Sequence, residues 1–185
     1  KRKILMFTDW LTCACTTHII PEGKGVMDDL QTHITKKPMH VLGYGNVRGV
    51  DMKYWRRDNA DAAKVSQLRD NDRFTFLFVG RIVNKGINEL VEAFMLIHKV
   101  LKARLFLVGR FEGKLDPIAD STRKIIEECD DIVCAGPQYG TDLLAYYAAS
   151  DCFVFPSYRE GFPNTVLEAG AMELPSIVTD INGSR

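Results

Sequence analysis

The sequence lacks any apolar run close to the ~18–20 residues that a membrane-spanning helix needs, so we expect no segment that crosses a bilayer. It also lacks an excess of charge of either sign, with 24 Lys+Arg against 24 Asp+Glu in 185 residues. A protein that binds nucleic acid chiefly by neutralising phosphates is therefore not indicated. The composition, 46% hydrophobic and 26% charged, is that of a globular protein, and the length allows one domain and part of a second.

Cysteine is sparse, odd in number and scattered. Cys13 and Cys15 are followed by no second Cys/His pair at zinc-finger spacing, and the four histidines are separated along the chain. We expect Cys134 and Cys152 to pack as small hydrophobic residues in a protein of a reducing compartment. No cleavage-site pattern of a signal peptide follows the first residues, and the missing initiator methionine suggests a piece of a longer protein.

Over the second two-thirds of the chain, short β-rich runs alternate with helical patterns. The run Phe74–Val79 is almost continuously apolar and is followed by Gly80, which is typical of a buried parallel strand. We predict strands at 74–79, 104–108, 132–135, 152–155 and 176–179, with helices at 87–101, 117–129, 141–149 and 163–173. Strands separated by helices predict right-handed crossovers and an α/β fold, a doubly wound parallel sheet. In such sheets ligands bind at the carboxyl ends of the strands, here the loops 80–86, 109–116, 136–141, 156–163 and 180–185.

The first 50 residues have a different pattern. We predict helices at 2–15 and 24–35, short strands at 18–21 and 39–42, and a glycine-rich connector at 43–49. This segment has too little apolar surface for a core of its own. We therefore expect residues 1–50 to be the end of a neighbouring domain, and residues 51–185 to be the main domain.

The stretch 157–168 carries the strongest chemical signal. Pro163 is a good first helical residue, and Phe162 before it cannot cap the helix, so a phosphate could take the place of the cap. Glu168 follows Asn164 and Thr165 by one helical turn, and Glu160 precedes the helix, so two carboxylates would flank the anion site. Sugar hydroxyls between the two carboxylates and the anion would reduce the repulsion between these negative charges. The alternative is that Glu168 only complements the helix dipole and that Glu160 is a solvated loop charge.

A second candidate lies after the first predicted strand. Gly80, Arg81 and Lys85 stand in a loop that is neither a GxGxxG fingerprint nor a Walker loop, so dinucleotide and P-loop chemistry are not supported. A guanidinium and an ammonium at this edge suit a diphosphate and could neutralise it without a metal. The alternative is a pair of solvated surface charges. Tyr139, after the third strand, could approach a nucleotide base, whereas we expect Tyr146 and Tyr147 to be packing residues.

These motifs resemble glycosyltransferase family 4, whose members are retaining enzymes of the GT-B architecture that use nucleotide sugars. The resemblance rests on Gly80-Arg81 with Lys85-Gly86, on the run from Glu160 to Glu168, and on the run from Pro175 to Gly183. It implies the Rossmann-like C-terminal half of a GT-B fold, without its last strand and helices, and a short remnant of the N-terminal domain. Lys85 follows Arg81 by four positions, one fewer than the family pattern.

The resemblance also implies roles for individual residues. Glu160 would be the catalytic residue beside the reacting carbon of the sugar, and Glu168 would bind the ribose hydroxyls. Arg81 and Lys85 would hold the diphosphate. The complete set of donor-binding residues implied is Gly80, Arg81, Lys85, Gly161, Phe162, Pro163, Asn164, Thr165 and Glu168. No metal and no cofactor would be needed.

The partners implied are a nucleotide-diphosphate sugar and a sugar or lipid-linked acceptor, the latter bound by the N-terminal domain. We expect no nucleic acid, a cytoplasmic location that includes the inner face of the membrane, and peripheral membrane contact by the full-length protein. Bacterial capsule, lipopolysaccharide or exopolysaccharide synthesis is the expected pathway, and the 185 residues alone are expected to have little activity. The alternatives are another GT-B protein, such as a nucleotide-sugar epimerase, and a non-catalytic sugar-nucleotide-binding domain.

Overall fold

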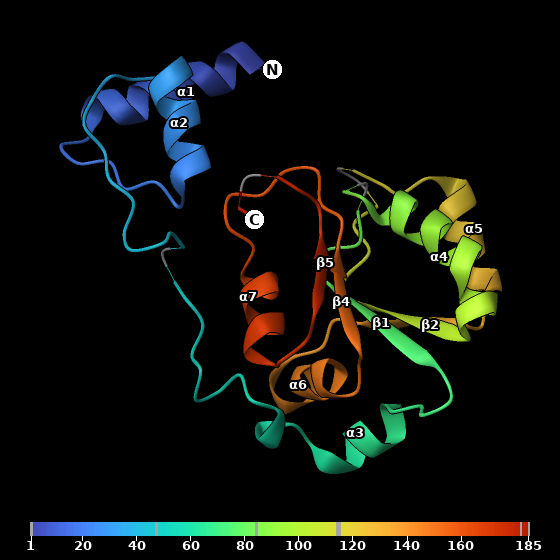
Figure 1. The fold of residues 1–185 in the computed structure, drawn as a ribbon. Coiled ribbons are helices and arrows are strands. Elements are labelled where there is room, and N and C mark those ends of the chain that lie inside the picture. The colour runs from blue at the N-terminus through green and yellow to red at the C-terminus, as the bar shows by residue number, and fades with distance from the viewer. Residues whose placement is uncertain (1, 47, 84, 114–115, 182, 185) are drawn as a thin grey trace. The chain divides into compact units, whose positions relative to one another are not determined.

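The computed structural model describes residues 2–46, 48–83, 85–113, 116–181 and 183–184 (Figure 1). The chain divides into two compact units. The larger consists of Val50–Tyr158 and Asn164–Thr179, and the smaller of Lys1–Gly49, Arg159–Pro163 and Asp180–Arg185.

The larger unit is built on a parallel sheet with the strand order β3-β2-β1-β4-β5. The chain moves outward from β1 to β3, returns to place β4 beside β1, and moves outward again to β5, so the order reverses between β1 and β4. The strands are β1 (Phe74–Val79), β2 (Ala103–Val108), β3 (Ile132–Gly136), β4 (Cys152–Phe155) and β5 (Ser176–Val178). The predicted doubly wound α/β fold is confirmed.

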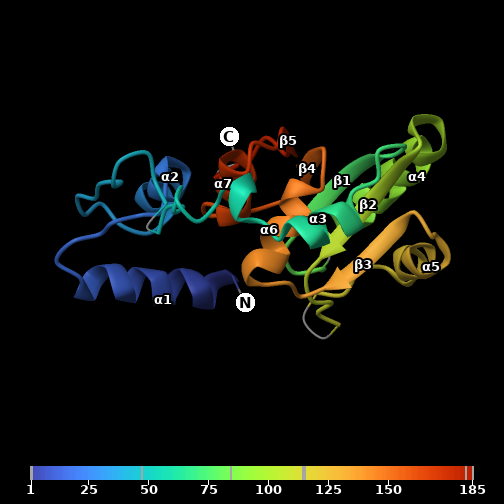
Figure 2. The same cartoon turned by 90° about the horizontal axis from the view of Figure 1, so that it is seen from below.

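Helices cover both faces of this sheet. They are α4 (Ile87–Leu101), α5 (Asp120–Glu128), α6 (Gly140–Ala148) and α7 (Asn164–Ala171). Figures 1 and 2 show α4 and α5 on one face, and α6 and α7 on the other. This division follows from right-handed crossovers, because a chain that reverses direction along the sheet places its next helices on the opposite face.

The core forms because the central strands are apolar on both faces, as in parallel sheets that helices cover on both sides. Every residue of β2 is buried, and α4 buries one stripe: Ile87, Leu90, Val91, Phe94 and His98. Gly86 precedes α4 with φ +89°, and a Cβ there would lie 1.8 Å from the carbonyl oxygen of Pro156. Glycine is therefore required where α4 begins beside the end of β4.

Several predicted boundaries need correction. The helix predicted at 117–129 is the shorter α5, and the helix predicted from Pro163 begins at Asn164, so Pro163 lies just before it. Two elements before β1 were not predicted, η1 (Arg57–Asn59) and α3 (Ala62–Leu68). Asp61 caps α3, because its Oδ1 accepts a hydrogen bond from the Lys64 amide at 2.7 Å.

In the smaller unit, the helix predicted at 2–15 is confirmed as α1 (Arg2–Cys15), and α2 (Lys24–His33) ends two residues earlier than predicted. The predicted strands 18–21 and 39–42 are wrong, since their contact is a single bridge between Ile19 and Met39. Lys37 closes the end of α1 by donating to the carbonyl groups of Cys13, Ala14 and Thr16. Among the described residues, no helix combines the length and the apolar character needed to span a membrane.

Candidate functional site

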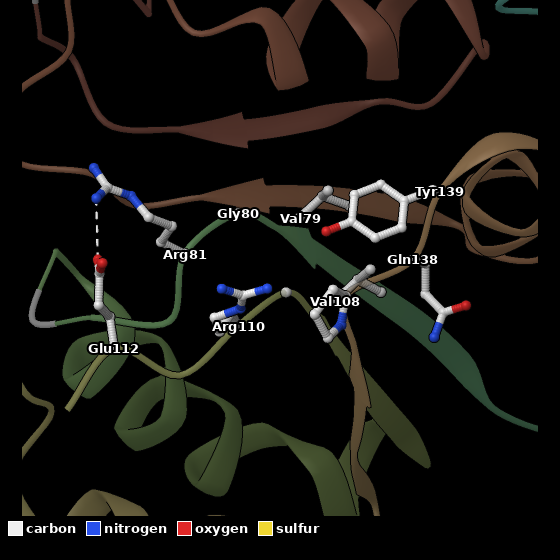
Figure 3. Close-up of a pocket in the computed structure, with 10 residues that line it drawn as sticks. Val79, Gly80, Arg81, Val108, Arg110, Glu112, Gln138 and Tyr139 are labelled. Carbon is white, nitrogen blue, oxygen red and sulfur yellow. Dashed lines mark hydrogen bonds and ion pairs between the residues drawn. The ribbon is translucent and has the colours of Figure 1, made fainter.

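A cavity of about 440 Å³ opens at the carboxyl ends of β1, β2 and β3 (Figure 3). Its size is within the range of small-molecule sites, and this edge of a doubly wound sheet is where ligands bind. The described residues that line it are Val79, Gly80, Arg81, Val108, Gly109, Arg110, Glu112, Pro137, Gln138 and Tyr139.

The sequence Val-Gly-Arg occurs twice in the lining of the cavity. Val79-Gly80-Arg81 ends β1 and Val108-Gly109-Arg110 ends β2, in register with each other. Gly109 has φ +150°, and a Cβ there would lie 1.7 Å from the Gly80 carbonyl oxygen. The two backbones can approach this closely because position 109 is glycine.

The strands remain paired beyond these glycines. The Ile82 amide donates to the Arg110 carbonyl at 2.9 Å, and the Glu112 amide donates to the Ile82 carbonyl at 3.3 Å. The backbones that carry Arg81, Arg110 and Glu112 are therefore fixed relative to one another by the end of the sheet.

The charged side chains lie at the rim. The Arg81 guanidinium, 70% exposed, pairs with Glu112 at 3.0 Å, and Figure 3 shows Arg110 between this pair and Tyr139. Two guanidinium groups at one edge suit the oxygens of a diphosphate. Tyr139, which is 74% exposed, also lines the cavity.

Sequence reasoning missed three of the polar residues in this cavity. Arg110, Glu112 and Gln138 were not singled out, although the second Val-Gly-Arg triplet was a visible signal for Arg110. Glu112 had no such signal, because its pairing depends on the ladder that continues beyond β1 and β2.

Glu168 accepts a hydrogen bond from Tyr147, which the sequence predicted to be a packing residue. The Tyr147 hydroxyl donates to Glu168 Oε2 at 3.1 Å, and the Tyr147 side chain is fully buried between Trp55 and Phe153. Burial, and then the neighbouring Glu168 carboxylate, raise the pKa of Tyr147 well above its ordinary value. Tyr147 therefore stays a neutral phenol that can donate to Glu168. Asn164, Thr165 and Glu168, all half-buried, lie along α7 in the larger unit.

The predicted residues Glu160, Gly161, Phe162 and Pro163 belong to the smaller unit. A Cβ at Gly161 would lie 2.3 Å from the Glu22 carboxylate, and one at Gly45 would lie 2.9 Å from the Phe162 ring. The loop is thus packed against two segments that are far away in the sequence. Glu160 is half-buried and Pro163 is buried.

Of the predicted donor-binding residues, Gly80 and Arg81 line the cavity. Lys85 lies in the turn before α4, where its amide donates to the Val83 carbonyl at 2.7 Å. Among the described residues, neither Lys85 nor any residue of α7 lines the cavity.

Residues 73–185 match the family described as "Glycosyl transferases group 1", which is more than half of the chain. The chain belongs to this family of glycosyltransferases. The predicted family of glycosyltransferases is therefore confirmed.

The chain is 29% identical to the capsular polysaccharide biosynthesis glycosyltransferase CapM of Staphylococcus aureus, over 100% of the chain and 49% of CapM. Sucrose-phosphate synthase from Thermosynechococcus elongatus has a similar fold, with a TM-score of 0.79 at 23% identity over 98% of this chain and 45% of that one. Anabaena Alr3699/HepE, solved with UDP-glucose, gives a TM-score of 0.71 at 15% identity over 91% of this chain and 46% of that one. The chain thus spans about half the length of these proteins, and its fold is the Rossmann-like half of a GT-B glycosyltransferase.

Proposed function

We propose that this glycosyltransferase transfers a sugar from a nucleotide-diphosphate sugar with retention of configuration, and that the larger unit binds the donor. The observation that carries the proposal is the cavity at the carboxyl edge of the sheet, with Arg81 and Arg110 at its rim. HepE, which shares the fold, has been solved with UDP-glucose, which supports a donor of this class.

In this proposal the diphosphate lies at the ends of β1 and β2. Arg81 and Arg110 supply the positive charge, and Lys85, in the next turn, adds a third cation to the same loop region. The base lies toward Gln138 and Tyr139, where an aromatic ring and an amide side chain line the cavity. Because the arginines can neutralise the departing diphosphate, the reaction needs no metal and no cofactor.

Glu168 would bind the ribose hydroxyls through its carboxylate, oriented by the hydrogen bond from Tyr147. A buried neutral phenol is a suitable positioning group, because it fixes one carboxylate oxygen without removing the negative charge that accepts hydrogen bonds from a ribose. Asn164 and Thr165 supply amides of the first turn of α7, with Gly80, Gly161, Phe162 and Pro163 as the remaining donor-binding positions.

Glu160 is proposed as the catalytic residue beside the reacting carbon. The acceptor hydroxyl attacks from the face on which the diphosphate leaves. The new carbon–oxygen bond forms as the bond between C1 and the phosphate oxygen breaks, and the electron pair goes to that oxygen. The leaving oxygen takes the proton of the acceptor hydroxyl, so configuration is retained and no general base from the protein is required.

The similarity to CapM over the whole chain supports a role in bacterial capsule, lipopolysaccharide or exopolysaccharide synthesis. A sugar or lipid-linked acceptor would be bound by a further domain, with the protein in the cytoplasm or at the inner face of the membrane and in peripheral contact with it. A nucleotide-sugar epimerase is less well supported, because none of the described histidines lines the cavity.

The proposal is tested with the full-length protein and a panel of UDP-, GDP- and ADP-sugars in the presence of a metal chelator. We expect release of the nucleoside diphosphate with one donor, and a product whose anomeric configuration, read by NMR, matches that of the donor. An inverted product would disprove retention, and absence of release with every donor would disprove the transferase assignment for this protein.

Glu160→Gln separates a transferase from a binding domain. We expect turnover to fall on the order of 10²-fold or more while donor affinity stays within about threefold, because the residue acts mainly on the transition state. A chain that only binds sugar nucleotides would show no turnover in either form. Unchanged turnover in Glu160→Gln would remove Glu160 from the catalytic role.

A further inference from the structure

A second group of chemically active side chains lies at the opposite edge of the sheet from the donor cavity. His98 lies in the last turn of α4, Cys129 ends α5, and Asp131 directly precedes β3. One ligand atom from each of the three residues lies within 4.8 Å of the other two. These residues are at the amino ends of the strands, so the proposed transferase mechanism does not use them.

The His98 ring is held in the orientation that a metal ligand needs. Its Nδ1 lies 3.3 Å from the Met95 carbonyl oxygen, which can only accept a hydrogen bond. In the tautomer that donates this hydrogen bond from Nδ1, Nε2 is the ring atom that can bind a metal. It lies 4.0 Å from Asp131 Oδ2, which is too long for a hydrogen bond. A protonated Nδ1 bound to a carbonyl is the usual outer contact of a metal-binding histidine.

The two carboxylate oxygens of Asp131 also face different partners. Its Oδ1 accepts a hydrogen bond from the Arg73 guanidinium at 2.7 Å, while Oδ2 is the oxygen nearest to His98. Arg73 also pairs with Asp70 at 2.7 Å, so its positive charge is shared by two carboxylates. The outer contacts of both His98 and Asp131 are therefore already present.

The donor set of the cluster selects the metal. Imidazole nitrogen, thiolate sulfur and carboxylate oxygen together are typical of zinc, whereas magnesium and calcium take oxygen ligands. With metal–ligand bonds of about 2.0–2.3 Å, tetrahedral ligands stand roughly 3.3–3.8 Å apart, so the ligand atoms, now within 4.8 Å of one another, would move together by up to about 1.5 Å. His98 and Asp131 also line a hollow of about 450 Å³, which leaves room for a water as fourth ligand.

We propose that His98, Cys129 and Asp131 form a zinc site that ties the end of α4 to the connection between α5 and β3. The site is structural, and it is independent of the donor cavity and of the proposed reaction. Cys129 binds as the thiolate, so one proton is released when the metal binds. Asp70, Asp72, Arg73, Lys99 and Lys102 also line the hollow, and Asp70 is paired with Arg73.

The test uses the purified, reduced protein, stripped with a chelator and titrated with zinc chloride, and in parallel with cobalt chloride. We expect one ion per chain, a rise in melting temperature with zinc, and a thiolate-to-cobalt absorption band. Cys129→Ser should abolish the band and weaken zinc binding by at least about tenfold. Cys134→Ser is the matched control, since Cys134 is an exposed thiol on β3 outside the cluster, and it should behave as the parent.

Asp131→Asn and His98→Gln should weaken zinc binding to a similar extent. Because His98 is buried, its variant could fail to fold, and Cys129→Ser then decides the question, since Cys129 is only half-buried. Failure of the parent protein to bind one zinc ion would overturn the proposal. Equal zinc affinity in the parent and in Cys129→Ser would overturn it as well.

Discussion

Arg81 and Arg110 each follow a Val-Gly pair at the end of a strand, and both line the cavity. Arg81 was predictable because it follows an unmistakable apolar strand. Arg110 follows an equally apolar strand, and comparison of the two strand ends would have found it. Glu112 and Tyr147 were not predictable as site residues, because their importance depends on contacts with residues 31 and 21 positions away in the sequence.

Glu112 limits the positive charge that Arg81 can offer to a phosphate. We predict that Glu112→Gln raises the affinity for the nucleoside diphosphate by about 2–5-fold, since an exposed ion pair of this kind is worth about 0.5–1 kcal/mol. Isothermal titration calorimetry at low ionic strength measures the change. A decrease in affinity would mean that Glu112 positions Arg81 for the ligand instead of competing with it.

Tyr147 should affect the donor more than the chemistry. We predict that Tyr147→Phe raises the donor KM by about 2–12-fold, equivalent to a hydrogen bond of about 0.5–1.5 kcal/mol, with little change in kcat. Tyr146→Phe is the control, because Tyr146 is a neighbouring buried tyrosine of α6 whose ring packs edge-on against Phe106. An equal KM increase in both variants would indicate loss of packing rather than loss of the bond to Glu168.

The same residue has a pH signature. The folded-state pKa of Tyr147 is raised, so its contribution to stability is fully present below the unfolded value of about 10 and is lost as pH rises toward the folded value. Unfolding free energy measured in urea should therefore fall above about pH 10 in the parent, and fall less in Tyr147→Phe. Parallel curves for the two proteins would contradict the raised pKa.

At the scale of elements, the close approach of β1 and β2 at their ends depends on glycine. Gly109→Ala should destabilise the fold by at least about 2 kcal/mol, because its Cβ would meet the Gly80 carbonyl oxygen at 1.7 Å. Gly170→Ala, in α7 and with nothing within 4 Å of an added Cβ, should instead stabilise by about 0.5 kcal/mol. Urea denaturation of both variants measures the contrast, and similar values would contradict the packing described at Gly109.

The elements also show how far sequence patterns reach. The five strands and α4 were predictable from apolar runs and one continuous apolar stripe, although β3 and β5 lie at the edges of the sheet and expose part of their residues. The strands predicted at 18–21 and 39–42 failed because Pro21 and Pro38 lack an amide hydrogen, which leaves little ladder to form. The helix α3 was missed although Asp61 is a clear capping residue, because seven residues carry too little periodicity to stand out.

At the scale of the whole molecule, the predicted site residues are divided between the two units. Arg81 and Glu168 belong to the larger unit, and Glu160 to Pro163 belong to the smaller. The sequence could not predict that grouping, because it rests on tight contacts of the loop with Glu22, Gly45 and Gly183, which come from distant segments. The predicted domains 1–50 and 51–185 placed Glu160 to Pro163 with the rest of the second domain.

The central claim is that the edge formed by the ends of β1 and β2 binds a nucleoside diphosphate without a metal. Calorimetric titration of the protein with UDP, GDP and ADP in the presence of a chelator tests it most directly. We predict one bound nucleotide per chain for at least one of the three. Arg110→Ala and Arg81→Ala should each weaken binding about tenfold or more, since a hydrogen bond to a charged group is worth about 1.5–3 kcal/mol. Arg56→Ala, an exposed arginine outside the cavity, should change nothing. Failure of all three nucleotides to bind, or equal affinity in the cavity variants and the parent, would contradict the account.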